Sequence, residues 1–132
     1  MADFLRFSVP GKPEYVGTVR LAVSSVASTA GFDVEEIEDI KVAVSEVCTS
    51  VFCKTRKSIS YQVNCELGEN GIIISICDEN SGICDETTAI PVLHETSGFS
   101  MGLLLVKALM DEVDIFTPDE KNTLIRMIKY YG

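Results

Sequence analysis

Two acidic residues stand where a carboxylate could take part in chemistry. Glu46 is the only charged residue in the segment 42–53, VAVSEVCTSVFC, and Asp78 directly follows the apolar run 72–77, IIISIC. A lone acid on an uncharged helical segment either extends to water or lies in a cleft where its charge is used, and the pattern leaves both interpretations open. Ser50 comes one helical turn after Glu46, so it is expected on the same side of the helix.

The segment 33–56 has the strongest helical pattern in the chain and would position Glu46. Acids are concentrated at its start, where they face the positive end of the helix dipole. An apolar stripe at helical spacing contains Ile37, Ile40, Val44, Val47, Cys48 and Val51. The opposite face is predicted to contain Asp39, Val42, Ala43, Glu46, Ser50 and Cys53. Glu46 is therefore expected among small and apolar groups, pointing away from the stripe.

The remaining elements follow from periodicity and turn residues. Alternating residues predict strands at 4–9, 59–67, 71–77, 113–117 and 123–130. Helical spacing predicts helices at 14–29, ended by Gly31, and at 101–110. The long segment between Asp78 and Gly102 has turn formers and little periodicity, which is typical of a functional lid.

The order of these elements predicts the fold class. We expect an α+β two-layer sandwich, in which a mixed, mostly antiparallel sheet is covered on one face by helices. Hydrophobic residues make up 46% of the 132 residues, which is enough for a compact core. With no linker-like tract in the chain, residues 1–132 are predicted to form a single domain.

Charge and cysteine usage disfavour several classes of function. A net charge of −9 argues against nucleic-acid binding, and no apolar run is long enough to span a membrane. The cysteines form no C-x-x-C pair, and His94 is the only histidine, so a zinc site or a disulfide framework is not expected. Buried, reduced thiols in the cytoplasm are predicted. The cysteines are Cys48, Cys53, Cys65, Cys77 and Cys84.

Three stretches of the chain resemble a known family. They are PGKPEYVGTVRLAVSSVASTAGFDVEEIEDIKVAVSEVCT, DENSGI and MGLLLVKALMDEV. Together they are similar to the bacterial anti-sigma-factor serine kinases of the RsbW/SpoIIAB type, which share an ATPase superfamily with histidine kinases, gyrase and Hsp90-type chaperones. The resemblance covers nearly the whole chain and implies a Bergerat, histidine-kinase-like ATPase fold that binds ATP and Mg²⁺.

The resemblance also implies roles for individual residues. In the family, the glutamate that corresponds to Glu46 polarises the attacking hydroxyl, and an asparagine at the position of Ser50 binds magnesium. The aspartate that corresponds to Asp78 accepts a hydrogen bond from the adenine amino group. The implied nucleotide-binding positions are Asp78, Asn80, Gly82, Ser100, Gly102 and Thr123. Asn80 and Ser100 replace family glycines, and Ser50 replaces the metal-binding asparagine. The alternative interpretation of Ser50 is that it is an ordinary helix serine with no role in metal binding.

The resemblance implies partners and leaves three functions to weigh. The first is an ATP-binding anti-sigma factor that phosphorylates an anti-anti-sigma (STAS-type) protein, acts as a homodimer and contacts its partners through Arg20. The second is a partner-switching binding module with weak or no catalysis that has lost the ability to use magnesium and ATP, suggested by Ser50, Asn80 and Ser100. The third is a scaffold dimer that binds no nucleotide. None of the three requires direct contact with nucleic acid or with a membrane.

Overall fold

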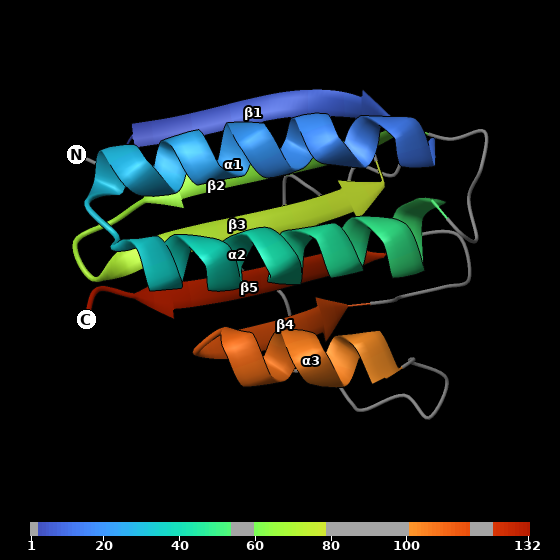
Figure 1. The fold of residues 1–132 in the computed structure, drawn as a ribbon. Helices are drawn as coiled ribbons and strands as arrows, with labels where there is room; N and C mark the ends of the chain where they lie inside the picture. The colour runs from blue at the N-terminus through green and yellow to red at the C-terminus, as the bar shows by residue number, and fades with distance from the viewer. Residues whose placement is uncertain (1–2, 54–59, 79–100, 117–122) are drawn as a thin grey trace.

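The computed structural model describes residues 3–53, 60–78, 101–116 and 123–132. Within these ranges, a five-stranded sheet has the order β1-β2-β3-β5-β4, and α1, α2 and α3 lie on one face of it (Figure 1). The strands are β1 (Asp3–Pro10), β2 (Ser60–Leu67), β3 (Gly71–Asp78), β4 (Glu112–Phe116) and β5 (Leu124–Tyr130). The helices are η1 (Pro13–Tyr15), α1 (Val16–Ala30), α2 (Val34–Val47), η2 (Cys48–Cys53) and α3 (Met101–Leu109). The predicted two-layer α+β sandwich is confirmed.

Every described pairing in the sheet is antiparallel, including that of β3 with β5. The central strand β3 is apolar because both of its sides are covered. Ile72, Ile74 and Ile76 face the helices and are fully buried, whereas Ser75 and Cys77 are buried on the opposite side. At its carboxyl end, β3 delivers Asp78, which is 4% exposed.

Local signals explain where α1 and α2 meet. Gly31 ends α1 in the left-handed conformation, with φ of 99°, which glycine adopts without steric cost. Asp33 then starts α2 through a capping box, in which its side chain accepts a hydrogen bond from the Glu36 backbone N–H at 2.8 Å. The Glu36 carboxylate accepts the Asp33 backbone N–H at 3.0 Å in return.

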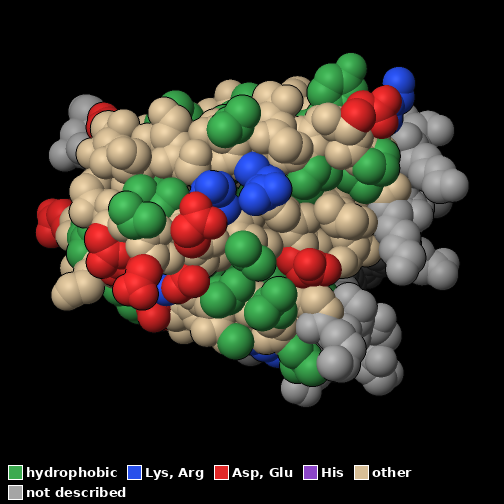
Figure 2. Space-filling view, viewed as in Figure 1, with side chains coloured by type: hydrophobic (Ala, Val, Ile, Leu, Met, Phe, Trp, Pro, Cys, Tyr) green, Lys and Arg blue, Asp and Glu red, His purple; other side chains and the backbone are tan. Residues whose placement is uncertain are grey.

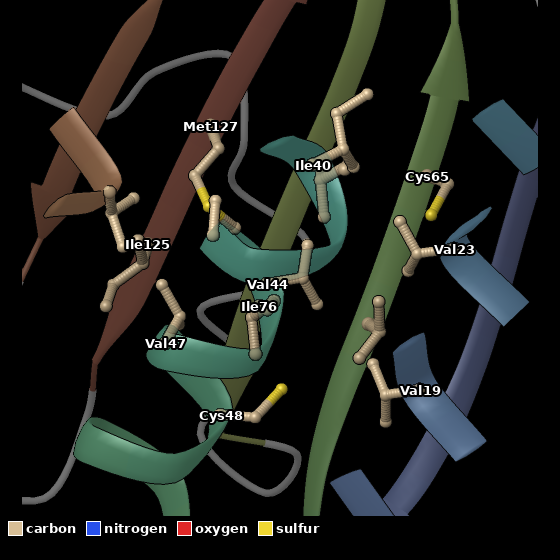
Figure 3. Packing of buried hydrophobic residues seen from close by; sticks show 14 of the residues in the cluster. Val19, Val23, Ile40, Val44, Val47, Cys48, Cys65, Ile76, Ile125 and Met127 are labelled. Atoms are coloured by element: carbon tan, nitrogen blue, oxygen red, sulfur yellow. The ribbon is translucent and has the colours of Figure 1, made fainter. Parts of the chain in front are cut away.

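The hydrophobic core lies between the sheet and the helices (Figure 3). Val19 and Val23 of α1 pack beside Val44 of α2, and Ile76 and Met127 contribute from the sheet below. All five side chains are fully buried. The predicted apolar stripe of the central helix is buried from Ile40 to Val51, with Ile37 partly buried at its edge.

The central helix departs from prediction in its second half. Its α-helical part ends at Val47 and continues as a π-helix, η2, to Cys53, while 54–56 fall outside the described residues. Ala43 and Cys53 were predicted on the face opposite the core, but both are buried. Ala43 is covered because α2 packs against both α1 and α3. Cys53 is turned inward because the wider turn of a π-helix changes the angular spacing of its side chains.

The cysteines within the described ranges agree with prediction with one exception. Cys48, Cys53 and Cys65 are free and buried. Cys77 is disulfide-bonded, so the prediction of a reduced thiol is wrong at this position. Cys77 differs from the other three because it points away from the main core and packs in a separate cluster with Leu124. Cys84 lies outside the described residues.

Candidate functional site

Glu46 and Ser50 contact each other at the junction of α2 and η2. Both side chains are half-buried, and the Ser50 hydroxyl donates a hydrogen bond to Glu46 Oε2 at 2.8 Å. Glu46 therefore does not extend freely into water, which was one of the two interpretations left open by the sequence. The distance is in the normal range for a hydroxyl bonded to a carboxylate.

Gly102 of α3 closes the other side of the Glu46 carboxylate. A Cβ atom at position 102 would overlap Glu46 Oε2 and lie 2.8 Å from both Cδ and Cγ of the same side chain. The Glu46 side chain thus lies directly against the backbone of α3. Three predicted site residues, Glu46, Ser50 and Gly102, are brought together from α2, η2 and α3, and we call them the glutamate cluster.

Asp78 and Thr123 form a second pair of predicted site residues. The Thr123 backbone N–H donates to Asp78 Oδ2 at 2.6 Å, and the Asp78 backbone N–H donates to the Thr123 carbonyl at 3.2 Å. Both residues are buried, with exposed fractions of 4% and 5%. The end of β3 is therefore tied to the residue that precedes β5, and the Asp78 carboxylate is held in one orientation.

The glutamate cluster and the Asp78–Thr123 pair lie at the same end of the sandwich (Figure 1). The carboxyl ends of α2 and β3, the start of α3 and the start of β5 are all found there, while β1 begins and β5 finishes at the other end. The antiparallel pairing of β3 with β5 brings Asp78 and Thr123 together at this end, since the end of one strand is then adjacent to the start of the other.

Three predicted nucleotide-binding residues, Asn80, Gly82 and Ser100, lie outside the described residues. The same holds for most of the predicted lid, since 79–100 are not described. Their assigned roles therefore stay predictions.

Arg20, the predicted partner-binding residue, is exposed on α1. It lies near Glu38 of α2, whose pKa is lowered, first by the hydrogen bond from Lys41 at 2.8 Å and by its charge, and to a smaller extent by the charge of Arg20. Figure 2 shows Lys and Arg side chains gathered in the middle of the helical face, with acidic side chains concentrated toward one end. Arg20 and Lys41 therefore share one acidic neighbour, Glu38, on a protein with a net charge of −9.

The donor atoms at this end of the molecule fit a nucleotide with its magnesium ion. Mg²⁺ is commonly bound by one or two protein oxygens together with substrate phosphates, and Glu46 and Ser50 present oxygens of this kind. A buried, oriented carboxylate such as that of Asp78 suits a hydrogen-bond donor such as an amino group. Among the described residues, no group of three or more His, Cys, Asp or Glu could hold a metal by itself, and no helix has the length and apolarity needed to cross a membrane.

Two contacts of this site were not predicted. The packing of Gly102 against Glu46 joins residues far apart in the chain, and no local pattern indicates it. The bond from Thr123 to Asp78 depends on the register of β3 with β5, which alternation alone does not set. The contact of Ser50 with Glu46, in contrast, follows from their spacing of four residues.

Comparisons with known proteins agree with this architecture. The model of the histidine kinase-like ATPase domain family matches residues 9–129. The chain is 32% identical over 140 residues to the serine-protein kinase RsbW of Bacillus subtilis, covering 98% of this chain and 86% of that protein. It is 37% identical over 142 residues to the serine-protein kinase RsbW of Oceanobacillus iheyensis, covering 97% of this chain and 87% of that protein.

A solved structure shows the same fold. The crystal structure of the RsbU and RsbW domains of a Mycobacterium tuberculosis protein matches with a TM-score of 0.67 at 19% sequence identity. The match covers 97% of this chain but only 32% of that one, so the similarity concerns one part of a longer protein. The helices and the antiparallel sheet described above are thus an arrangement also found in an RsbW domain.

Proposed function

We propose that this chain, which belongs to the RsbW-type serine-protein kinases and anti-sigma factors of the histidine kinase-like ATPase family, is an ATP-dependent kinase. Its protein substrate is a serine of an anti-anti-sigma protein of the STAS type. In the same proposal, the protein holds a sigma factor while ATP is bound. It releases the sigma factor when the antagonist binds in place of the sigma factor. It acts as a homodimer in the cytoplasm.

The observation that carries this proposal is the glutamate cluster. A carboxylate that is half-buried, hydrogen-bonded to Ser50 and packed against Gly102 is restrained in a way that an ordinary surface acid is not. Restraint of this kind is what phosphoryl transfer requires, because its catalysis consists mainly of positioning and charge stabilisation. The cluster lies at the same end of the fold as Asp78, the residue proposed to bind the adenine amino group.

Each residue has a defined part in the proposed reaction. ATP supplies the phosphoryl group, and a Mg²⁺ ion bound with the phosphates would neutralise their charge. Glu46 accepts the proton of the substrate serine hydroxyl while the serine oxygen forms its bond to the γ-phosphorus. The bond from that phosphorus to the bridging oxygen breaks, and ADP leaves with this oxygen. Asp78, held in place by the Thr123 N–H, accepts the hydrogen bond of the adenine amino group. Asn80, Gly82, Ser100 and Gly102 are proposed to contact the nucleotide through their backbone.

Arg20 is proposed as a contact for the protein partners. It is exposed, and its charge, like that of Lys41, acts on Glu38 of α2. A cation on a chain with a net charge of −9 is suited to an acidic segment of a partner.

Replacement of Glu46 by glutamine tests the proposal. Glu46→Gln keeps the size of the side chain but removes its ability to accept a proton, so transfer of labelled phosphate from ATP to a STAS-type antagonist should fall by about 100-fold or more. Glu35→Gln is the matched control, because Glu35 is an exposed acid in the first turn of the same helix. The control should transfer phosphate at about the wild-type rate.

The second candidate function is a binding module without efficient catalysis. Ser50 favours it, because a serine stands where the related kinases have a metal-binding asparagine. Wild-type protein that binds a sigma factor but transfers no phosphate would select this module over the kinase. Equal rates for Glu46→Gln and wild type would remove Glu46 from the mechanism.

A further inference from the structure

The hydrogen bond from Ser50 to Glu46 uses the single proton of the serine hydroxyl. Ser50 Oγ lies 2.8 Å from Glu46 Oε2, in a part of the chain that is half-buried. Oε1 of the same carboxylate accepts no hydrogen bond from the residues that the structure describes. One oxygen of Glu46 is therefore held by the serine hydroxyl.

The backbone of α3 restrains the same oxygen from a second direction. Gly102 leaves just enough room for the carboxylate, since a Cβ there would overlap Oε2 and lie 2.8 Å from Cδ. Oε2 is thus confined between the Ser50 hydroxyl and the Gly102 backbone. Both restraints come from residues whose other proposed roles concern the metal ion and the phosphates.

The π-helix places the serine. Ser50 is the third residue of η2, which begins at Cys48, directly after the last turn of α2. π-helical turns are uncommon and occur often at functional sites, where they reorient one side chain relative to the preceding helix. Phe52 and Cys53 at the end of η2 are buried and anchor this turn in the core.

We infer that Ser50 is a positioning residue for Glu46, and that Gly102 completes the same restraint by leaving space for the carboxylate. This inference rests on the proposed kinase function. This positioning role differs from a role in metal binding. A positioning Ser50 acts through Glu46, so the magnesium requirement would not depend on Ser50. Glu46 alone remains the catalytic residue of the three.

Kinetics of three Ser50 variants separate the two roles. Ser50→Ala should lower kcat for phosphate transfer by about 10- to 100-fold, the cost of a misplaced reacting group. The KM for ATP and the Mg²⁺ concentration for half-maximal rate should stay within about twofold of wild type. Ser50→Thr keeps a hydroxyl and should restore most of the rate. Ser50→Asn should leave the Mg²⁺ requirement unchanged.

Gly102→Ala tests the second restraint. The added Cβ should displace the carboxylate and lower kcat, while the same substitution in a Glu46→Gln background should have little further effect on kcat. Gly17→Ala is the matched control, since a Cβ on that helical glycine of α1 meets no atom within 4 Å. It should leave the rate unchanged.

The outcomes distinguish this inference from the proposed function. An active wild type with an equally active Ser50→Ala variant would overturn the positioning role alone. A Ser50→Ala defect that appears in the Mg²⁺ requirement, with kcat recovered at saturating magnesium, would also overturn it and would assign Ser50 to the metal. A wild type that transfers no phosphate would instead overturn the kinase function on which the inference rests.

Discussion

Burial changes the acid–base behaviour of the Cys65 thiol. Its side chain lies in β2 on the face toward the helices and is fully buried. Loss of solvation raises the pKa of this thiol from 9.0 to about 12, because the charged thiolate is disfavoured in the core. The contribution of this pKa difference to the free energy of unfolding is fully present below pH 9.0. It is lost as the pH rises toward about 12, because the Cys65 thiol ionises first in the unfolded chain.

We expect Cys65→Val to weaken the dependence of stability on alkaline pH. Above about pH 9, the free energy of unfolding of the wild type should fall by about 1.4 kcal/mol per pH unit more than that of the variant. Urea unfolding at about pH 8 and about pH 10.5 measures this difference. Parallel losses of stability in the two proteins would show that Cys65 ionises equally easily in the folded and unfolded states.

At the scale of elements, the approach of β5 to β3 depends on Gly71. A Cβ at this position would overlap the Lys129 carbonyl oxygen and lie 2.8 Å from Tyr130 Cα. Both are backbone atoms, so β5 itself would have to move. The consequence reaches the functional end of the fold, because the same β3–β5 pairing brings Asp78 next to Thr123.

Gly71→Ala is therefore expected to destabilise the protein by about 1–3 kcal/mol, the usual cost of forcing extra volume into a packed region. Gly68→Ala in the same hairpin is the control, because its nearest neighbour would be the Gly71 carbonyl oxygen at an ordinary 3.8 Å. Its effect should stay within about 0.5 kcal/mol. Urea midpoints of the two variants give the comparison, and equal midpoints would mean that β5 adjusts without cost.

Periodicity predicted most of the elements well, because the helices bury one side against the sheet. The predicted strand 4–9 is observed as Asp3–Pro10, and the predicted end of a helix at Gly31 coincides with its left-handed conformation. The π-helix could not be predicted in this way. Val51, Phe52 and Cys53 are three consecutive buried residues, which fit neither a helical stripe nor a strand.

At the scale of the whole molecule, contacts between distant segments decide how the site is assembled. The resemblance of the chain to a kinase family indicated Glu46, Ser50, Asp78, Gly102 and Thr123 separately. Their grouping into two contacts depends on how α3 packs against α2 and how β5 pairs with β3. These are tertiary interactions, and the residues on each side carry no local sign of the partner they meet.

ATP should bind the folded form, in which α3 packs against α2 and β5 pairs with β3. ATP should therefore raise the melting temperature. At about 100 times its dissociation constant, a ligand stabilises the folded state by about 2.7 kcal/mol, which corresponds to about 10 °C for a domain of this size. Magnesium should increase the rise if the ion binds with the nucleotide. Thermal unfolding with ATP or ADP, each with and without Mg²⁺, measures these shifts.

Asp78→Asn provides the control at the adenine end of the proposed site. The asparagine carbonyl can still accept the Thr123 N–H, so the junction of β3 and β5 should be retained. Its amide group cannot replace the second carboxylate oxygen as an acceptor, so the shift with ATP should fall well below that of the wild type. A wild type whose melting temperature is unchanged by any nucleotide would contradict ATP binding and leave a scaffold that binds no nucleotide. Equal shifts in both proteins would mean that Asp78 does not recognise the adenine.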